Sequence, residues 1–163
     1  MKELKSVFSR EELTENAVKL LKKLIATPSM SRDEYNVSLI IEGFFNEHQI
    51  KVNRFKNNIW ATNKYFDAGK PSILLNTHHD TVKPNKAYTL DPFIPVEKDG
   101  KLFGLGSNDA GASLVAMAQT FLYFYEAEDL THNLVIALTA EEEISGLDGI
   151  EALFPQLPNV ELA

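Results

Sequence analysis

The chain has 163 residues, of which 44% are hydrophobic and 24% are charged, a balance typical of one folded domain rather than a disordered or fibrous chain. Its formal net charge of −7 disfavours nucleic acid and anionic lipid as partners, because they carry charge of the same sign. The absence of cysteine excludes disulfide bonds, thiolate nucleophiles and thiolate metal sites, so any metal must be bound by histidine and carboxylate.

The first predicted elements are two amphipathic helices. Ser9, with Glu12 three residues later, forms a capping box, and apolar residues at helical spacing follow until Pro28 stops the helix. Ser31 and Glu34 repeat the pattern and predict the cap of a second helix with its own apolar stripe.

Strands dominate the middle of the chain. A proline-, aspartate- and glycine-rich loop is expected over residues 83–106, and a buried helix from about Asp109. The run NLVIALT is continuously apolar and flanked by polar residues, which is typical of a buried central strand. The predicted strands are residues 50–55, 58–66, 72–77 and 133–139.

The alternation of strands and helices predicts an α/β fold whose sheet is covered on both faces. Residues 1–163 contain no internal repeat, low-complexity tract or linker, so they are expected to belong to one domain. The final residues, PNVELA, have the pattern of another buried strand, so we expect a fragment of a longer protein. The charged N-terminus and the lack of a long apolar run predict a cytoplasmic protein without membrane contact.

The strand at residues 72–77 leads into His78, His79 and Asp80. Residues two apart in an extended segment point to the same side, so Asp80 can accept the imidazole N–H of His78 and direct the other nitrogen outward. Metal-binding histidines commonly have this arrangement, although one His-x-Asp alone is more simply a polar loop after a strand. His79 is expected to face the other way, toward packing or solvent.

Carboxylates follow at two further positions. Asp109 precedes a predicted helix, so it can cap that helix or bridge two cations through its two oxygens. Glutamates 141–143 follow the strand at residues 133–139, where a solvated helix start would also stabilise them. Ligand sites of open α/β sheets lie beyond the carboxyl ends of strands. His78, Asp80 and the glutamates all follow such ends, which favours one shared site.

A glycine-rich segment, GLGSNDAG, is a weak candidate for binding a nucleotide. It lacks the Lys-Ser/Thr of a P-loop, and its third glycine is displaced from the dinucleotide pattern. It also follows a loop rather than a strand, so nucleotide binding is disfavoured.

The stretches THHDTVKP, DPFIPVEKDGKLFGLGSNDAG and LTAEEEISG, in this order and spacing, resemble the dinuclear zinc amidohydrolases and exopeptidases. This family includes acetylornithine deacetylase, succinyl-diaminopimelate desuccinylase, aminoacylase and glutamate carboxypeptidase, and the second stretch is similar to the loop of the acetylornithine deacetylase branch. The resemblance implies a zinc-exopeptidase-like catalytic domain with a largely parallel or mixed sheet. Residues 1–163 would be its incomplete N-terminal part.

The resemblance also implies a role for each candidate residue. His78 would bind one zinc ion, Asp109 would bridge two, and Glu143 would bind the other. Asp80 would orient His78, and Glu142 would be the general base. The implied cofactor is Zn²⁺, two per complete site, with Co²⁺ as a substitute.

The implied reaction is hydrolysis of the amide bond of an N-acyl amino acid, of the N-acetyl- or N-succinyl-ornithine type, in arginine biosynthesis. A dipeptidase or carboxypeptidase of the same family is the alternative within the enzymes. A non-catalytic interaction module is the alternative outside them. Nothing in these residues identifies the acyl group.

The chain departs from the family pattern in several places. His79 stands where a small residue is common, and Ala110-Gly111 follows Asp109 in place of Met-Lys-Gly. One more carboxylate ligand, a final histidine and the inserted lid domain, through which the family forms homodimers, lie beyond these residues. Two ligands would remain for each ion against the three or four of a stable zinc site. We therefore expect little activity from this piece alone.

Overall fold

A computed structural model describes residues 8–163. No helix in this range is long and apolar enough to cross a membrane. The strands are β1 (Asn53–Phe55), β2 (Asn58–Thr62), β3 (Ser72–His78), β4 (Val96–Lys98), β5 (Lys101–Phe103), β6 (Asn133–Thr139) and β7 (Val160–Leu162). The helical elements are α1 (Arg10–Ile25), α2 (Tyr35–Glu47), η1 (Ser107–Ala112), α3 (Ser113–Phe124), η2 (Glu142–Ile144), α4 (Ile150–Leu153) and η3 (Phe154–Gln156).

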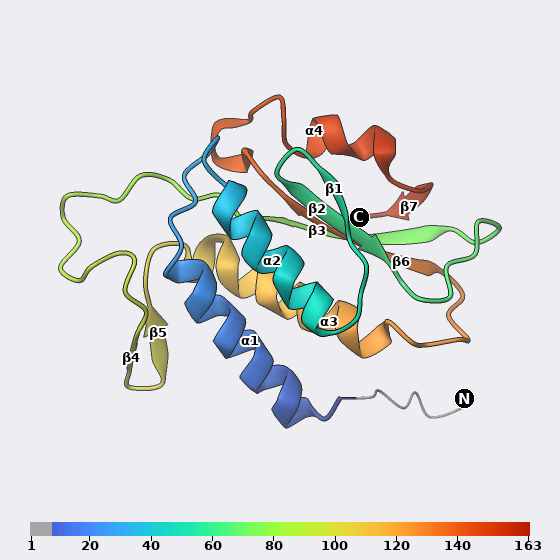
Figure 1. Ribbon diagram of the computed structural model, residues 1–163, viewed down its shortest axis with the longest axis horizontal. Coiled ribbons are helices and arrows are strands. Elements are labelled where there is room, and N and C mark those ends of the chain that lie inside the picture. The colour runs from blue at the N-terminus through green and yellow to red at the C-terminus, as the bar shows by residue number, and fades with distance from the viewer. Residues whose placement is uncertain (1–7) are drawn as a thin grey trace.

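Five strands form one mixed sheet in the order β1-β2-β6-β3-β7 (Figure 1). The neighbours β3 and β6 are parallel, and His78 pairs with Thr139 where both strands end. β2 is antiparallel to β6, and β7 is parallel to β3. Because parallel strands end at the same edge of a sheet, the segments that follow β3 and β6 begin side by side.

The sheet buries a different set of side chains on each face. All residues of β6 are buried, as predicted for a central strand. Ile136 and Leu138 belong to the larger core, which they share with α1, α2 and α3. Val135 and Ala137 point the other way and pack with Leu153 of α4. Helices therefore cover both faces, which confirms the predicted α/β architecture.

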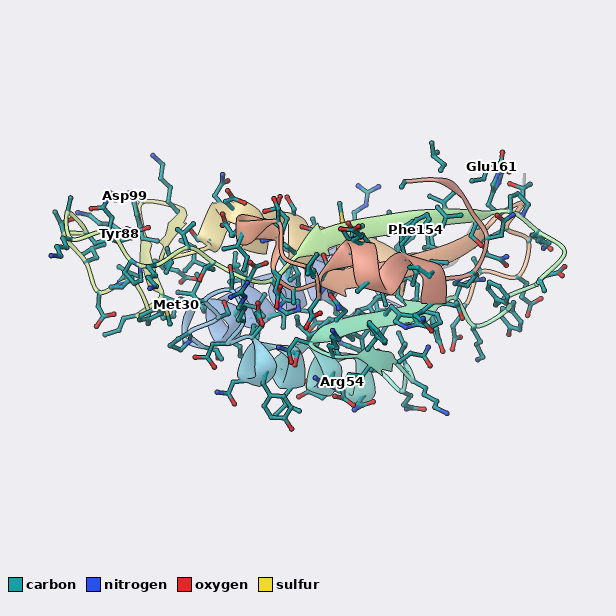
Figure 2. All side chains as sticks on the ribbon, turned by 90° about the horizontal axis from the view of Figure 1, so that it is seen from above. Met30, Arg54, Tyr88, Asp99, Phe154 and Glu161 are labelled. Atoms are coloured by element: carbon teal, nitrogen blue, oxygen red, sulfur yellow. The ribbon has the colours of Figure 1, made fainter. Side chains whose placement is uncertain are left out.

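The loop at residues 83–106 contains a hairpin that the sequence analysis did not predict. β4 and β5 pair antiparallel around Asp99 and Gly100, whose φ angles are 52° and 71°. Positive φ at both central positions is the mark of the tight hairpin turn that Asp-Gly favours. Figure 2 shows Tyr88 and Asp99 at the end of the molecule opposite Glu161, so this loop projects away from β7.

The two predicted helix caps have different outcomes. The capping box of α1 is confirmed: the hydroxyl of Ser9 accepts the N–H of Glu12 at 3.1 Å, and the carboxylate of Glu12 accepts the N–H of Ser9 at 2.8 Å. The box predicted for α2 is wrong, because α2 begins without a side-chain cap. Ser31 donates its hydroxyl hydrogen to Asp80 instead, and Glu34 is completely buried. Tertiary partners have replaced the local ones.

The predicted C-terminal strand forms as β7 but is not buried. It pairs with β3 alone among the described residues, at the edge of the sheet. Leu162 is 63% exposed. Val160 packs against the core cluster on the α4 side of the sheet, whereas the other edge of β7 is open among the described residues.

Candidate metal centre

Three predicted site residues come together at the carboxyl edge of the sheet. One ligand atom from each of His78, Asp109 and Glu143 lies within 4.8 Å of the others. His78 ends β3, Glu143 lies in η2 just after β6, and Asp109 lies in η1. The carboxylate of Glu142 is 3.6 Å from Nε2 of His78. The parallel pairing of β3 and β6 brings two of these segments together.

The ring of His78 is held in one orientation. Its Nδ1 lies 3.0 Å from the backbone carbonyl oxygen of Asp80 and 3.4 Å from the Asp80 carboxylate. Nε2 faces the Asp109 carboxylate at 3.1 Å. Hydrogen bonding to Asp80 is the main effect that raises the pKa of His78, to about 9. Nδ1 donates its hydrogen to Asp80, so Nε2 is the nitrogen that faces the carboxylates. A nitrogen lone pair next to carboxylate oxygens is stabilised only when Nε2 carries a proton or binds a cation.

Asp80 connects the end of β3 to the turn of glutamates. It is buried and accepts the Ser31 hydroxyl at 2.7 Å, the Glu142 N–H at 3.0 Å and the Glu143 N–H at 3.2 Å. Burial raises the pKa of Asp80, but hydrogen bonds from His78, Ser31 and the two amides outweigh it and lower the pKa to about 2. Asp80 lies just beyond the end of β3, but the N–H of His79 still bonds to Thr139 and Thr81 pairs with Met30, so the extended direction of the strand continues past it.

The segment around Asp109 differs from the prediction of a regular helix. α3 begins at Ser113, and Asp109 and Ala110 inside η1 have non-helical φ and ψ angles of −109° and 102°, and of −113° and 24°. Asp109 makes no helix cap, and its side chain is 78% exposed. The capping interpretation is therefore wrong, and the Asp109 carboxylate faces His78 instead.

The glutamates form a tight turn rather than the start of a regular helix. Glu141 has a φ of 58°, and η2 is a single short turn. Glu141 Oε2 accepts the N–H of Asp148 at 3.5 Å. The Glu141 side chain is therefore directed toward Asp148 and is not part of the cluster. Burial is the main effect that raises the pKa of Glu143, and the Asp109 carboxylate adds to it. The neighbouring His78 imidazole acts in the opposite direction and lowers the pKa of Glu143.

This donor set fits a divalent metal ion. Imidazole nitrogen and carboxylate oxygen are the ligands that zinc accepts in the absence of cysteine. Two ligands about 2.0–2.1 Å from a tetrahedral ion lie about 3.3 Å apart. The distance between His78 Nε2 and the Asp109 carboxylate is 3.1 Å, close to that spacing. The identity of the ion and the assignment of these residues as its ligands stay predictions.

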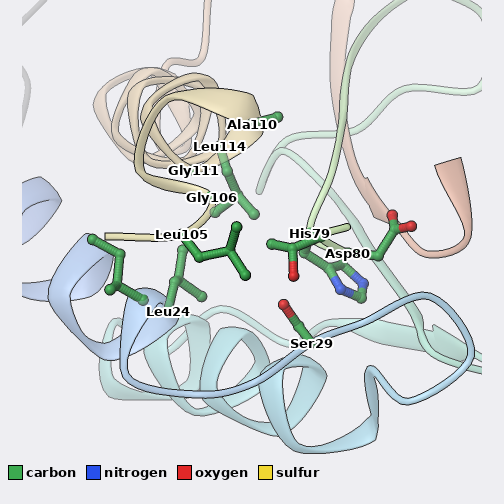
Figure 3. Close-up of a pocket in the computed structure, with 11 residues that line it drawn as sticks. Leu24, Ser29, His79, Asp80, Leu105, Gly106, Ala110, Gly111 and Leu114 are labelled. Atoms are coloured by element: carbon green, nitrogen blue, oxygen red, sulfur yellow. The ribbon is translucent and has the colours of Figure 1, made fainter. Parts of the chain in front are cut away.

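His79 packs inside the protein beside a small cavity (Figure 3). The cavity has a volume of about 20 Å³, and Ser29 and Leu105 are among the residues that line it. His79 Nε2 lies 3.1 Å from the carbonyl oxygen of Asn57, so this histidine does not point at the cluster. Burial lowers its pKa to about 4. The expectation that His79 faces away from His78 and packs is confirmed.

The metal-free chain is expected to be most stable near pH 6.5. Burial favours neutral His79, so its contribution is present above the ordinary pKa of 6.5 and is lost as pH falls toward about 4. Hydrogen bonding favours protonated His78, so its contribution is present below 6.5 and is lost as pH rises through about 9. Urea unfolding with a chelator at about pH 5, 6.5 and 8.5 measures both slopes. His79→Gln should reduce the acid slope and leave the slope above pH 6.5 in place; an unchanged acid slope contradicts this assignment.

Sequence reasoning missed the polar residues that support this cluster. The spacing of Ser31 and Glu34 predicted a helix cap rather than a role at this site. Nothing in the sequence around Asn58 predicted that this residue would be completely buried. Buried polar side chains become recognisable only when the fold shows which backbone groups they satisfy.

A histidine and carboxylates that could hold a metal ion thus meet at the carboxyl edge of a mixed α/β sheet, where the ligand sites of such sheets lie. The chain belongs to the family described as Peptidase family M20/M25/M40, which matches residues 74–161. That stretch contains all three residues of the cluster.

Curated relatives are deacylases. The chain is 28% identical over 149 residues to a succinyl-diaminopimelate desuccinylase from Sulfurovum sp., which covers 90% of this chain and 39% of that protein. It is 38% identical over 143 residues to an acetylornithine deacetylase from Proteus mirabilis, which covers 78% of this chain and 36% of that protein. The chain thus spans well under half the length of these relatives.

Solved structures share the fold. Human carnosine dipeptidase 1 aligns with a TM-score of 0.71 at 19% identity, over 87% of this chain and 35% of that one. A dinuclear metal-binding peptidase of the same family from Bacillus subtilis aligns with a TM-score of 0.66 at 18% identity, over 90% of this chain and 40% of that one. At these identities the likeness concerns the architecture alone.

Proposed function

We propose that the protein containing this chain hydrolyses the amide bond of an N-acyl amino acid with an acetyl or succinyl acyl group, using two bound Zn²⁺ ions. The convergence of His78, Asp109 and Glu143 within 4.8 Å carries the proposal. The desuccinylase and deacetylase relatives support the substrate class. Residues 1–163 would form the N-terminal part of the catalytic domain. Arginine biosynthesis, a cytoplasmic location and a homodimer stay predictions.

Each residue of the cluster would have a separate task. His78 and Glu143 would each hold one ion, and Asp109 would be shared between them. When bound, such ions lower the pKa of a coordinated water toward about 7 and polarise the scissile carbonyl group. Asp80 fixes the direction of His78 through its contact with Nδ1.

Glu142 would move the proton. Its side chain is 59% exposed and its carboxylate lies 3.6 Å from His78 Nε2, so it borders the cluster while staying open to substrate. The carboxylate would take a proton from the attacking water and deliver it to the departing amine nitrogen. General base and acid catalysis of this kind contributes about 10²–10⁴-fold to a rate.

The proposal is tested on a protein extended to the length of its relatives. It is expected to hydrolyse N-acetylornithine or N-succinyl-diaminopimelate, to lose this activity with a chelator, and to regain it with Zn²⁺. Faster hydrolysis of a dipeptide would replace the substrate class by the dipeptidase alternative. Hydrolysis of none of these substrates by the metal-loaded protein would favour the non-catalytic module.

A further inference from the structure

The backbone that carries Glu142 and Glu143 is held by side chains from elsewhere in the fold. The N–H groups of residues 140–143 are four in succession, and each donates to a side-chain oxygen. The acceptors, in chain order, are Asn58 at 2.9 Å, Glu34 at 3.3 Å, and Asp80 at 3.0 and 3.2 Å. This turn therefore depends on tertiary contacts rather than on a helix or a sheet.

The three acceptors come from separate parts of the chain and share complete burial. Glu34 directly precedes α2, Asn58 begins β2, and Asp80 follows β3. Each has a relative exposure of 0%. Water cannot replace a buried acceptor, so the loss of one leaves an N–H group unpaired at a cost of about 1–3 kcal/mol. These bonds give the turn one preferred position.

Glu34 is anchored on both of its oxygens. Oε1 accepts the N–H of Arg32 at 2.6 Å in addition to that of Glu141, and Oε2 accepts the side-chain amide of Asn57 at 2.9 Å. Glu141 has a φ of 58°, a region that residues other than glycine enter at a cost. By accepting the N–H of Glu141, Glu34 stabilises the turn at its strained residue, just before Glu142.

We propose that Glu34 is a positioning residue. By holding the amide of Glu141, it fixes the turn that follows and so directs the carboxylates of Glu142 and Glu143 toward His78. The importance of Glu34 for hydrolysis rests on the proposed function. Its effect on the position of the turn is independent of that function and can be measured without metal.

The test compares Glu34→Ala with a rescue pair in the 163-residue chain. In Glu34→Gln/Asn57→Asp, the new glutamine can keep its oxygen toward Glu141 and donate its amide to the new aspartate, which reverses the bond between positions 34 and 57. Amide hydrogen exchange at residues 141–143 reports on the turn. Zinc titration of the same variants in a protein extended to the length of its relatives reports on the cluster.

Asn133→Ala is the matched control. Asn133 is also buried and makes three hydrogen bonds to backbone groups, with Asp67 and Lys70, but it lies at the opposite end of β6. It should lower global stability without changing the glutamate turn. Exchange rates are compared after correction for the global stability of each variant.

Glu34→Ala is expected to speed exchange at Glu142 and Glu143, whose own acceptor is untouched, by about tenfold or more. It should also weaken zinc binding by about 10-fold to 100-fold, the usual effect of losing an outer-shell partner. The rescue pair should restore both measurements to within about threefold of wild type. Should Glu34→Ala prevent folding, Glu34→Met takes its place, because it nearly fills the volume of the glutamate side chain but offers no acceptor to the Glu141 N–H.

The inference is overturned by unchanged exchange at Glu142 and Glu143, or by an equal effect from Asn133→Ala. If the protein extended to the length of its relatives binds no zinc while the exchange results are as expected, the metal-dependent function fails and the positioning of the turn stands. If zinc binds normally to wild type and Glu34→Ala alike, the positioning role fails and the proposed function stands.

Discussion

Replacing Glu142 by glutamine is expected to lower amide hydrolysis by about 10²–10⁴-fold in a protein extended to the length of its relatives. Glutamine keeps the size of the side chain but cannot accept a proton. It leaves the Glu142 N–H bond to Asp80 in place, so the turn should not move. Steady-state kinetics measures the loss in kcat, and metal analysis should show unchanged occupancy.

Its neighbours supply the controls for this substitution. Glu141→Gln should keep turnover within about threefold, because the Glu141 side chain faces the Asp148 amide rather than the cluster. Glu143→Gln should instead lower metal occupancy, because Glu143 contributes a ligand atom to the cluster. Turnover of Glu142→Gln within about threefold of wild type would show that another group moves the proton.

Replacing Asp80 by alanine is expected to destabilise the chain by about 3–5 kcal/mol. The substitution removes the buried acceptor of the Ser31 hydroxyl and of two backbone N–H groups, so three partly buried donors lose their partner. It also removes the carboxylate beside His78 Nδ1. Urea unfolding of the 163-residue chain without metal at pH 7 measures the loss.

A second aspartate near the same turn supplies the comparison. Asp148 forms an exposed ion pair with Lys56, so Asp148→Ala should change stability by no more than about 1 kcal/mol. The stabilisation by Asp80 is present above its ordinary pKa of 3.8 and is lost as pH falls toward about 2. The difference between Asp80→Ala and wild type should therefore shrink in strong acid. A loss below about 1 kcal/mol at pH 7 contradicts the role given to Asp80.

The elements that the sequence predicts best are those whose determining residues lie close together in the chain. The capping box at Ser9 forms as expected, because both partners lie within one turn of α1. The seven residues of β6, five of them apolar, form a central strand, because a run buried on both faces needs no other information. The convergence of His78 with Glu143 followed from a general rule about the ends of parallel strands.

Predictions failed where a residue had both a local and a distant partner available. Ser31 and Glu34 have the spacing of a capping box, yet they bind Asp80 and the amide of Glu141. Asp109 has the position of a helix cap, yet its backbone leaves the helical region and its carboxylate faces His78. For Ser31 and Glu34, a distant partner in a buried setting stabilises more than an exposed local cap. For all three residues, sequence spacing cannot show which partner is near.

The sequence by itself determined which residue types are available and that residues 133–139 form a buried strand, because an apolar run and its polar ends are properties of a few consecutive residues. It also determined that any metal site must use histidine and carboxylate, since there is no cysteine. The tertiary structure alone decided that buried oxygens of Glu34, Asn58 and Asp80 hold the glutamate turn. The physical reason is that a hydrogen bond between segments far apart in the chain forms only after packing has excluded water from both partners.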